Sequence, residues 1–314
     1  MTEGAHSFRF DAMGSPCEVR LYAADHEHAA RAARSAIGEV QRIEQAYSRY
    51  LTGNITCAMN AAARLGDSIE VDKETSRLLD IAFAAYDRSD GLFDITSGVL
   101  RTVWNDKRKS VPTRSEISAA LRCVGLCKVE WRRPWLTFSE PGMQMDFGGI
   151  GKEYAADLAA RKLVEHGIDS GVVDLGGDLT VIGPHPDGEP WRIGIRDPNR
   201  PDAAIATLFV ERGGIASSGN YERFWELGGK RYGHILNPRT GWPVEGPLSV
   251  TVLADSCLEA GLTATIAMLK GEEGAAWLNT TSLPHLYIGA NGALNGLDLD
   301  GVKRQKNSPS ETAP

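Results

Sequence analysis

A glycine-rich run that begins at Asp146 combines the residue types that a phosphate group needs. It reads DFGGIGK over residues 146–152 and stands where a predicted strand gives way to a predicted helix. The glycines would let a phosphate approach backbone N–H groups at the positive end of the helix, while Lys152 supplies a positive charge and Asp146 a carboxylate. An ordinary strand-to-helix turn is the alternative, because the spacing matches neither the P-loop nor the dinucleotide fingerprint.

A second pair of segments places one histidine beside polar loops. SGNYER (218–223) is followed by HILNPRTG (234–241). A lone histidine in an apolar run is more often a core residue than a catalyst. His234, however, stands beside a Pro-Arg-Thr-Gly turn, where a neutral imidazole could take a proton from a hydroxyl. This pair is the most specific chemical feature of the chain.

Two further segments carry weaker signals. GLFDITSG (91–98) surrounds one aromatic residue with small and polar residues. It could present backbone groups and a ring to a planar ligand, or it could be a helix cap, because Asp, Thr and Ser accept hydrogen bonds at helix starts. EAGLTAT (259–265) opens the last long predicted helix with small residues, a pattern typical of close helix packing.

The elements that must position these segments follow from the hydrophobic periodicity. Apolar residues at helical spacing predict helices at about 33–47, 73–88, 152–166 and 258–269. Alternating residues predict a strand at 17–22 after a turn at 13–16, and VDLGGDLTVIG (173–183) predicts two short strands joined by a glycine turn. The polar segment 303–314 is expected to be a disordered tail.

Composition limits the class of protein. The chain has 314 residues, of which 42% are hydrophobic and 24% charged, so we expect a single domain over 1–302 with two subdomains possible. Its 34 basic and 41 acidic residues give a net charge of -7, which argues against nucleic acid or an anionic membrane as the main partner. The five scattered cysteines, without a lipid-anchor motif, favour a cytoplasmic protein with reduced thiols.

Taken in order, these segments resemble the ApbE family of FAD:protein FMN transferases over roughly residues 8–290. The pieces that carry the resemblance are MGS (13–15), SRY (48–50) with Asn60, FDIT (93–96), DFGGIGK (146–152), DLGGD (174–178), SGNYER (218–223) and HILNPRTG (234–241). The resemblance implies an α+β fold of mixed sheets packed by helices, with an FAD cleft between two intimately associated halves. It implies an enzyme that moves FMN from FAD to a Thr or Ser hydroxyl of an acceptor flavoprotein and releases AMP.

The resemblance also assigns roles to individual residues. His234 would be the catalytic residue. Contacts to the flavin and the adenylate would be made by Met13, Tyr50, Leu92, Phe93, Asp94, Asp146, Lys152 and Ile235. A Mg²⁺ ion would be held by the backbone carbonyl of Gly149, the hydroxyl of Thr265 and an acidic side chain at position 261, all oxygen ligands.

Position 261 departs from this pattern because it is glycine. A second departure is Glu153, which follows Lys152 where the family usually has glycine. Loss of a carboxylate removes a ligand and a negative charge from a site for a hard cation. Three explanations stay open: Glu259 or Asp255 reaches the ion, FAD phosphates and water complete a weaker site, or the protein binds FAD without transfer. The functions to be compared are therefore FMN transfer, FAD hydrolysis to FMN and AMP, and non-catalytic FAD binding.

Overall fold

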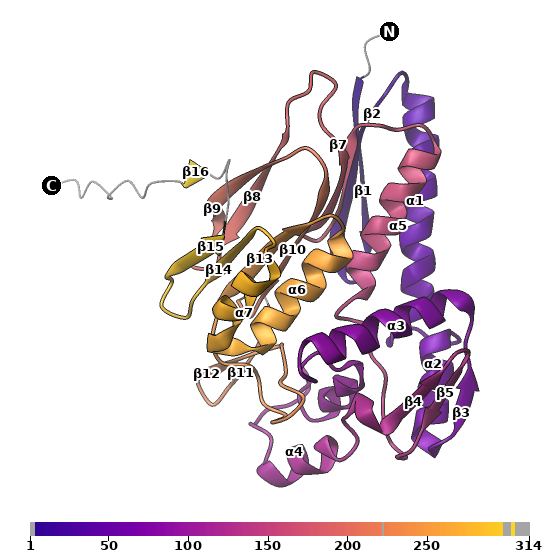
Figure 1. The fold of residues 1–314 in the computed structure, drawn as a ribbon, viewed down its shortest axis with the longest axis vertical. Coiled ribbons are helices and arrows are strands. Elements are labelled where there is room, and N and C mark those ends of the chain that lie inside the picture. Colours follow the sequence, from indigo (N-terminus) through magenta and orange to yellow (C-terminus); the bar gives the residue numbers. More distant parts are fainter. Residues whose placement is uncertain (1–3, 222, 298–302, 305–314) are drawn as a thin grey trace, which may run out of the picture.

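An eight-stranded antiparallel sheet forms the centre of the fold in the computed structural model, which describes residues 4–221, 223–297 and 303–304 (Figure 1). Its strands, in spatial order, are β1 (Gly4–Ala12), β2 (Ser15–Ala23), β6 (Gly171–Leu175), β7 (Asp178–Gly183), β10 (Gly213–Gly219), β13 (Ser249–Ala254), β14 (His285–Ile288) and β15 (Leu294–Leu297). The predicted strand at 17–22 and the predicted pair within 173–183 are confirmed as β2, β6 and β7.

The predicted α+β class is confirmed, but no described sheet is mixed in strand direction. Each pair of neighbouring strands in the central sheet is antiparallel. Tight turns join β1 to β2 and β6 to β7, and strands joined in this way are antiparallel because parallel strands need a long crossover. Met13 and Gly14 both adopt positive φ in the first of these turns.

Three smaller sheets accompany the central one. They are formed by β8 (Trp191–Asp197), β9 (Arg200–Val210) and β16 (Lys303–Arg304); by β11 (Phe224–Leu227) and β12 (Lys230–Gly233); and by β3 (Ser68–Glu70), β5 (Trp135–Phe138) and β4 (Val129–Arg132). The short strand β16 falls within the segment 303–314 that was expected to be disordered, and it pairs with β9. Residues 305–314 of that segment lie outside the described residues.

Three of the described helices, α1, α5 and α6, cover one face of the central sheet. In Figure 1, α1 and α5 run side by side. The helices are α1 (His26–Tyr47), α2 (Ile55–Leu65), α3 (Lys73–Arg88), α4 (Arg114–Leu121), α5 (Gly151–Glu165), α6 (Cys257–Leu269) and α7 (Gly274–Thr281), with short 3₁₀ segments η1 (Ile95–Thr102), η2 (Leu126–Lys128) and η3 (Gly271–Glu273). The predicted helices at 73–88, 152–166 and 258–269 match α3, α5 and α6 to within one residue at each end.

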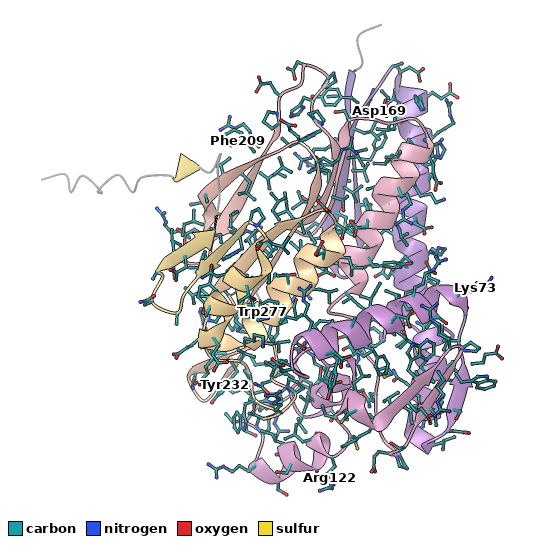
Figure 2. All side chains as sticks on the ribbon, in the orientation of Figure 1. Lys73, Arg122, Asp169, Phe209, Tyr232 and Trp277 are labelled. Atoms are coloured by element: carbon teal, nitrogen blue, oxygen red, sulfur yellow. The ribbon has the colours of Figure 1, made fainter. Side chains whose placement is uncertain are left out.

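The main hydrophobic core lies between the central sheet and α1, α5 and α6. Buried alanines on the facing sides of α1 and α5 allow these helices to approach closely: Ala29, Ala32, Ala33, Ala36, Ala155, Ala156, Ala159 and Ala160. A second core fills the space between the other face of the sheet and β8 and β9. Figure 2 shows side chains throughout the molecule, with Lys73 and Arg122 at its outer edges.

Two contacts fix where α6 begins. A Cβ atom on Gly214 of β10 would overlap the backbone of Ser256 and Cys257, so glycine is needed for α6 to lie this close to the sheet. The Asp157 carboxylate of α5 accepts hydrogen bonds from the backbone N–H groups of Cys257 and Leu258, at 2.9 and 3.0 Å. The start of α6 is therefore held against the second turn of α5.

No helix within residues 4–221 and 223–297 is both long enough and apolar enough to cross a membrane.

Candidate active site

A cavity of about 1390 Å³ opens beside the start of α5. Apart from position 261, every residue that the resemblance assigns to the site lines this cavity: Met13, Tyr50, Leu92, Phe93, Asp94, Asp146, Gly149, Lys152, His234, Ile235 and Thr265. These residues come from the β1–β2 turn, the loops after α1 and α3, the start of α5, the loop after β12, and α6. The cavity exceeds the roughly 300–1,000 Å³ of ordinary ligand pockets, a size that suits a ligand as long as a dinucleotide.

The glycine-rich turn before α5 is held by Asp146. Its Oδ2 atom lies 2.8 Å from Nη1 of Arg49, and its Oδ1 atom accepts a hydrogen bond of 2.8 Å from the backbone N–H of Gly148. Arg49 also donates to the carbonyl of Gly98 at 2.9 Å, which links the turn to η1. Arg49 was missed as a site residue, although it stands inside the SRY piece of the sequence.

The N-terminus of α5 faces the cavity with a lysine. Lys152 forms an ion pair with Asp178 of β7, and both side chains line the cavity. Burial disfavours the charge on Lys152, but the carboxylates of Asp178 and Glu153 outweigh burial and raise its pKa. No side chain in the described part of the chain caps the start of α5. A charged ammonium group and a helix N-terminus without a side-chain cap therefore stand together, as a phosphate requires.

Glu153, the next residue, carries a buried carboxyl group. Its side chain lines the cavity, yet the residue is only 7% exposed. Burial, with the neighbouring Asp178 carboxylate as the next cause, raises the pKa of Glu153 to about 8. Within the described residues, its Oε2 atom has no hydrogen-bond partner. A Cβ atom on Gly261 would lie 2.5 Å from its Cγ and 2.9 Å from its Oε1, so Glu153 occupies the space in front of Gly261.

His234 lies in the loop after β12, and its side chain is partly buried. Its Nδ1 atom lies 3.0 Å from the backbone carbonyl of Arg223. A carbonyl only accepts, so Nδ1 carries the hydrogen and Nε2 has a free lone pair. Burial, followed by the positive charge of Arg101, lowers the pKa of His234 to about 4. The imidazole is therefore neutral near pH 7 and able to accept a proton at Nε2. Arg101 belongs to none of the motifs described above, so it was not selected as a site residue.

The aromatic side chains of the cavity differ in exposure. Tyr50 is 84% exposed, so one face of its ring is open to a ligand. Phe93 is buried, and a Cβ atom on Gly149 would lie 3.2 Å from its ring. The ring of Phe93 thus packs against the glycine-rich turn. Leu92 and Ile235 add apolar surface to the cavity lining.

Asp94 shows that the cap interpretation of segment 91–98 is correct. Its carboxylate accepts hydrogen bonds from the backbone N–H and the hydroxyl of Thr96, at 2.7 and 2.6 Å, and from the backbone N–H of Leu126 at 2.9 Å. Burial raises the pKa of Asp94, with these hydrogen bonds opposing the effect. Asp94 lines the cavity and at the same time fixes the loop that carries Phe93.

The acidic residues around α6 do not form a metal cluster of the usual kind. The described part of the chain contains no group of three or more His, Cys, Asp or Glu side chains placed to hold a metal ion. Glu259 and Asp255, considered above as substitutes for an acid at position 261, are not among the described residues that line the cavity, whereas Glu153 is. Thr265, one turn after Gly261, is 2.9 Å from the Ser218 hydroxyl. The glutamate 222 of the SGNYER segment lies outside the described residues.

Comparison with known proteins shows which family this chain is similar to. The model of the ApbE family matches residues 13–287. An FAD:protein FMN transferase of Rhodobacter capsulatus is 32% identical over 270 residues, which are 84% of this chain and 51% of that relative, so this chain spans about half the length of that relative.

Two solved structures are similar over nearly their full lengths. The ApbE protein from Thermotoga maritima has a TM-score of 0.85 and 28% identity, covering 94% of this chain and 97% of that one. The apo flavinyl transferase ApbE of Pseudomonas stutzeri has a TM-score of 0.84 and 25% identity, covering 96% of each chain. With the family match extending from the β1–β2 turn to β14 and the same fold in both structures, this chain belongs to the ApbE family.

Proposed function

We propose that the protein is an FAD:protein FMN transferase, which moves FMN from FAD to a Thr or Ser hydroxyl of an acceptor flavoprotein and releases AMP. The observation that carries the proposal is the pairing, in one cavity, of a neutral His234 with Lys152 at the N-terminus of α5. The name of the Rhodobacter capsulatus relative supports the same activity. A protein that only bound FAD would have no use for a neutral imidazole with a free Nε2 lone pair at this place.

The reaction requires one proton transfer and one exchange of bonds at phosphorus. Nε2 of His234 takes the proton of the acceptor hydroxyl. The hydroxyl oxygen then forms a bond to the phosphorus of the FMN half, the bond from that phosphorus to the bridging oxygen breaks, and AMP leaves with the electron pair. Water in place of the acceptor hydroxyl would give FMN and AMP, so hydrolysis is the side reaction of the same site.

The remaining residues bind and orient FAD. Lys152 and the N–H groups at the start of α5 hold the pyrophosphate, because phosphoryl transfer depends on positioning and charge neutralisation more than on covalent help. Tyr50 stacks on a ring of the ligand, and Asp146 accepts hydrogen bonds from it. Met13, Leu92, Phe93 and Ile235 complete the apolar surface, and Asp94 holds the loop in place.

The residues present also fit a Mg²⁺ ion. Glu153 offers a buried carboxylate oxygen without a partner among the described residues, and Thr265 a hydroxyl in the same cavity. Together with the backbone carbonyl of Gly149, these oxygen donors would hold the ion. When bound, Mg²⁺ would neutralise charge on the pyrophosphate of FAD.

AMP release from FAD by the purified protein tests the function. We expect AMP and a gain of one FMN mass on an acceptor flavoprotein domain when Mg²⁺ is present, and neither product in EDTA. His234→Ala should abolish AMP release, while His26→Ala, which removes an exposed imidazole, should not. AMP without acceptor modification would identify a hydrolase, and tight FAD binding without AMP would identify a binding protein.

A cytoplasmic site of action is part of the same proposal. All five cysteines are free in the structure, as is usual in a reducing compartment. Fractionation of cells that produce the protein, followed by flavin fluorescence of the modified acceptor in each fraction, tests the location.

A further inference from the structure

Glu153 is a buried acid that lacks a counter-charge of its own. The residue is 7% exposed, and its Oε2 atom has no hydrogen-bond partner in the described part of the chain. The nearby cation, Lys152, is already in an ion pair with Asp178. A proton on Oε2 would not solve the problem, because an O–H group there would also lack a partner. A buried polar oxygen left in this way costs roughly 1–3 kcal/mol, and more when it is charged.

In spite of this cost, the side chain of Glu153 occupies a defined place between α5 and α6. The residue stands in the first turn of α5, and its side chain reaches across to α6 and lines the cavity. Its carboxyl group fills the space that a side chain at position 261 would need, since a Cβ atom there would lie 2.5 Å from Cγ and 3.0 Å from Cδ of Glu153. Only glycine at 261 leaves room for it.

We propose that Glu153 supplies, from α5, the carboxylate ligand of a divalent cation bound between the first turn of α5 and the segment of α6 from Gly261 to Thr265. The cation would take Oε2 of Glu153, the group left without a partner, and the hydroxyl of Thr265. Thr265 lies one helical turn after Gly261, so its side chain stands on the same face of α6 as the space that Glu153 fills. Its hydroxyl is 2.9 Å from that of Ser218, which keeps it directed toward the cavity.

The charges of the neighbourhood favour a bound cation. Lys152 and Asp178 neutralise each other through their ion pair, so a cation would balance the negative charge that Glu153 carries when its carboxyl group is ionised. Carboxylate and hydroxyl oxygens are hard donors of the kind that Mg²⁺ and Mn²⁺ accept. The inference rests on the proposed function for the choice of cation, but the test below needs neither FAD nor turnover.

Binding of Mn²⁺ to the full-length protein without FAD, followed by electron paramagnetic resonance of the free ion, is the test. Glu153→Gln keeps the size of the side chain and removes one donor oxygen, and we expect it to weaken Mn²⁺ binding by about tenfold or more, the cost of losing even an outer-shell partner of a metal site. Glu259→Gln is the matched control, since it removes an acid from the first turn of α6 that does not line the cavity. It should bind Mn²⁺ as the wild type does.

A second pair of variants keeps the test valid if Glu153→Gln folds poorly. Glu153→Gly empties the space in front of position 261, and Glu153→Gly with Gly261→Asp returns a carboxylate from the other helix. The double variant should bind Mn²⁺ at least about tenfold more tightly than Glu153→Gly alone. Equal binding by these two variants would overturn the inference.

Two further outcomes would also overturn it. One is unchanged Mn²⁺ binding in Glu153→Gln, and the other is no Mn²⁺ binding by the wild type at millimolar concentration. The outcome for the proposed function is separate: Mn²⁺ binding that depends on Glu153 without any AMP release would leave this inference standing and remove the transferase. AMP release with Mn²⁺ binding that is indifferent to Glu153 would do the reverse.

Discussion

Protonation of His234 should lower the stability of the folded protein in acid by a predictable amount. Its pKa is about 4 in the folded state, against about 6.5 for histidine in an unfolded chain. Between these values the unfolded chain binds a proton that the folded chain does not. The free energy of unfolding therefore falls as the pH falls from about 6.5 to about 4, and this contribution is constant above the upper value.

The magnitude follows from the two pKa values. Lowering the pH from about 7.5 to about 5 should cost the folded state about 2 kcal/mol through this one group. His234→Gln cannot take up the proton, so it should lose this part of the pH dependence. When the pH is lowered from about 7.5 to about 5, the unfolding free energy of the wild type should consequently fall by about 2 kcal/mol more than that of the variant.

Urea unfolding followed by tryptophan fluorescence at both pH values measures this shift. His26→Gln is the matched control, because it removes a surface imidazole and leaves the contribution of His234 in place. Under the proposed function, the same protonation should set the acid limb of kcat/KM for AMP release, which reports the free enzyme and should lie near pH 4. If the unfolding free energies of the wild type and His234→Gln differed by the same amount at both pH values, the reasoning would be refuted. An NMR titration midpoint of His234 near 6.5 would refute it as well.

Other predictions follow from the contacts described above. Gly214→Ala should lower the unfolding free energy by about 1–3 kcal/mol or more because α6 must move away from β10, while Gly38→Ala on the open surface of α1 should raise it by about 0.5–1 kcal/mol. Equal thermal stability of these two variants would contradict the packing described. Asp157→Ala should cost about 1–3 kcal/mol in urea unfolding by leaving two N–H groups of α6 without acceptors, and Asp157→Asn should cost less, so equal losses would count against the cap. Tyr50→Ala should weaken FAD binding by about 0.5–1.5 kcal/mol in calorimetry without a change in melting temperature, and Tyr50→Phe should bind like the wild type unless the contact is not a ring stack.

Hydrophobic periodicity predicted α3, α5 and α6 to within one residue at each end. The Ser-Asp-Gly sequence after Arg88 predicts the end of α3, and the structure adds Asp72 as the cap of its first turn. The start of α1 was placed too late. Its first turns are buried through Ala29 and Ala32, and alanine gives too weak a hydrophobic signal to mark a stripe, although Asp25 caps the helix.

The gathering of the site residues in one cavity was expected from ordered motifs, whereas pair contacts were not. Arg49 and Asp146 form an ion pair across 97 sequence positions, and nothing in either motif indicates the other. Likewise, the contact between Glu153 and Gly261 depends on the close packing of α5 and α6. Sequence patterns show which residues lie on one face of a helix, but the partner of that face is decided by the assembled core.

The shared space in front of Gly261 also restricts how sequences of this kind change over time. Because the space holds one carboxyl-bearing side chain, a substitution at position 153 or at position 261 alone leaves either two side chains in conflict or none at all. The two positions are therefore expected to change together, and an alignment column taken by itself misrepresents both. A survey that searched only the helix containing residue 261 for an acid would count this chain among those without one, although the neighbouring helix places an acid against the same backbone.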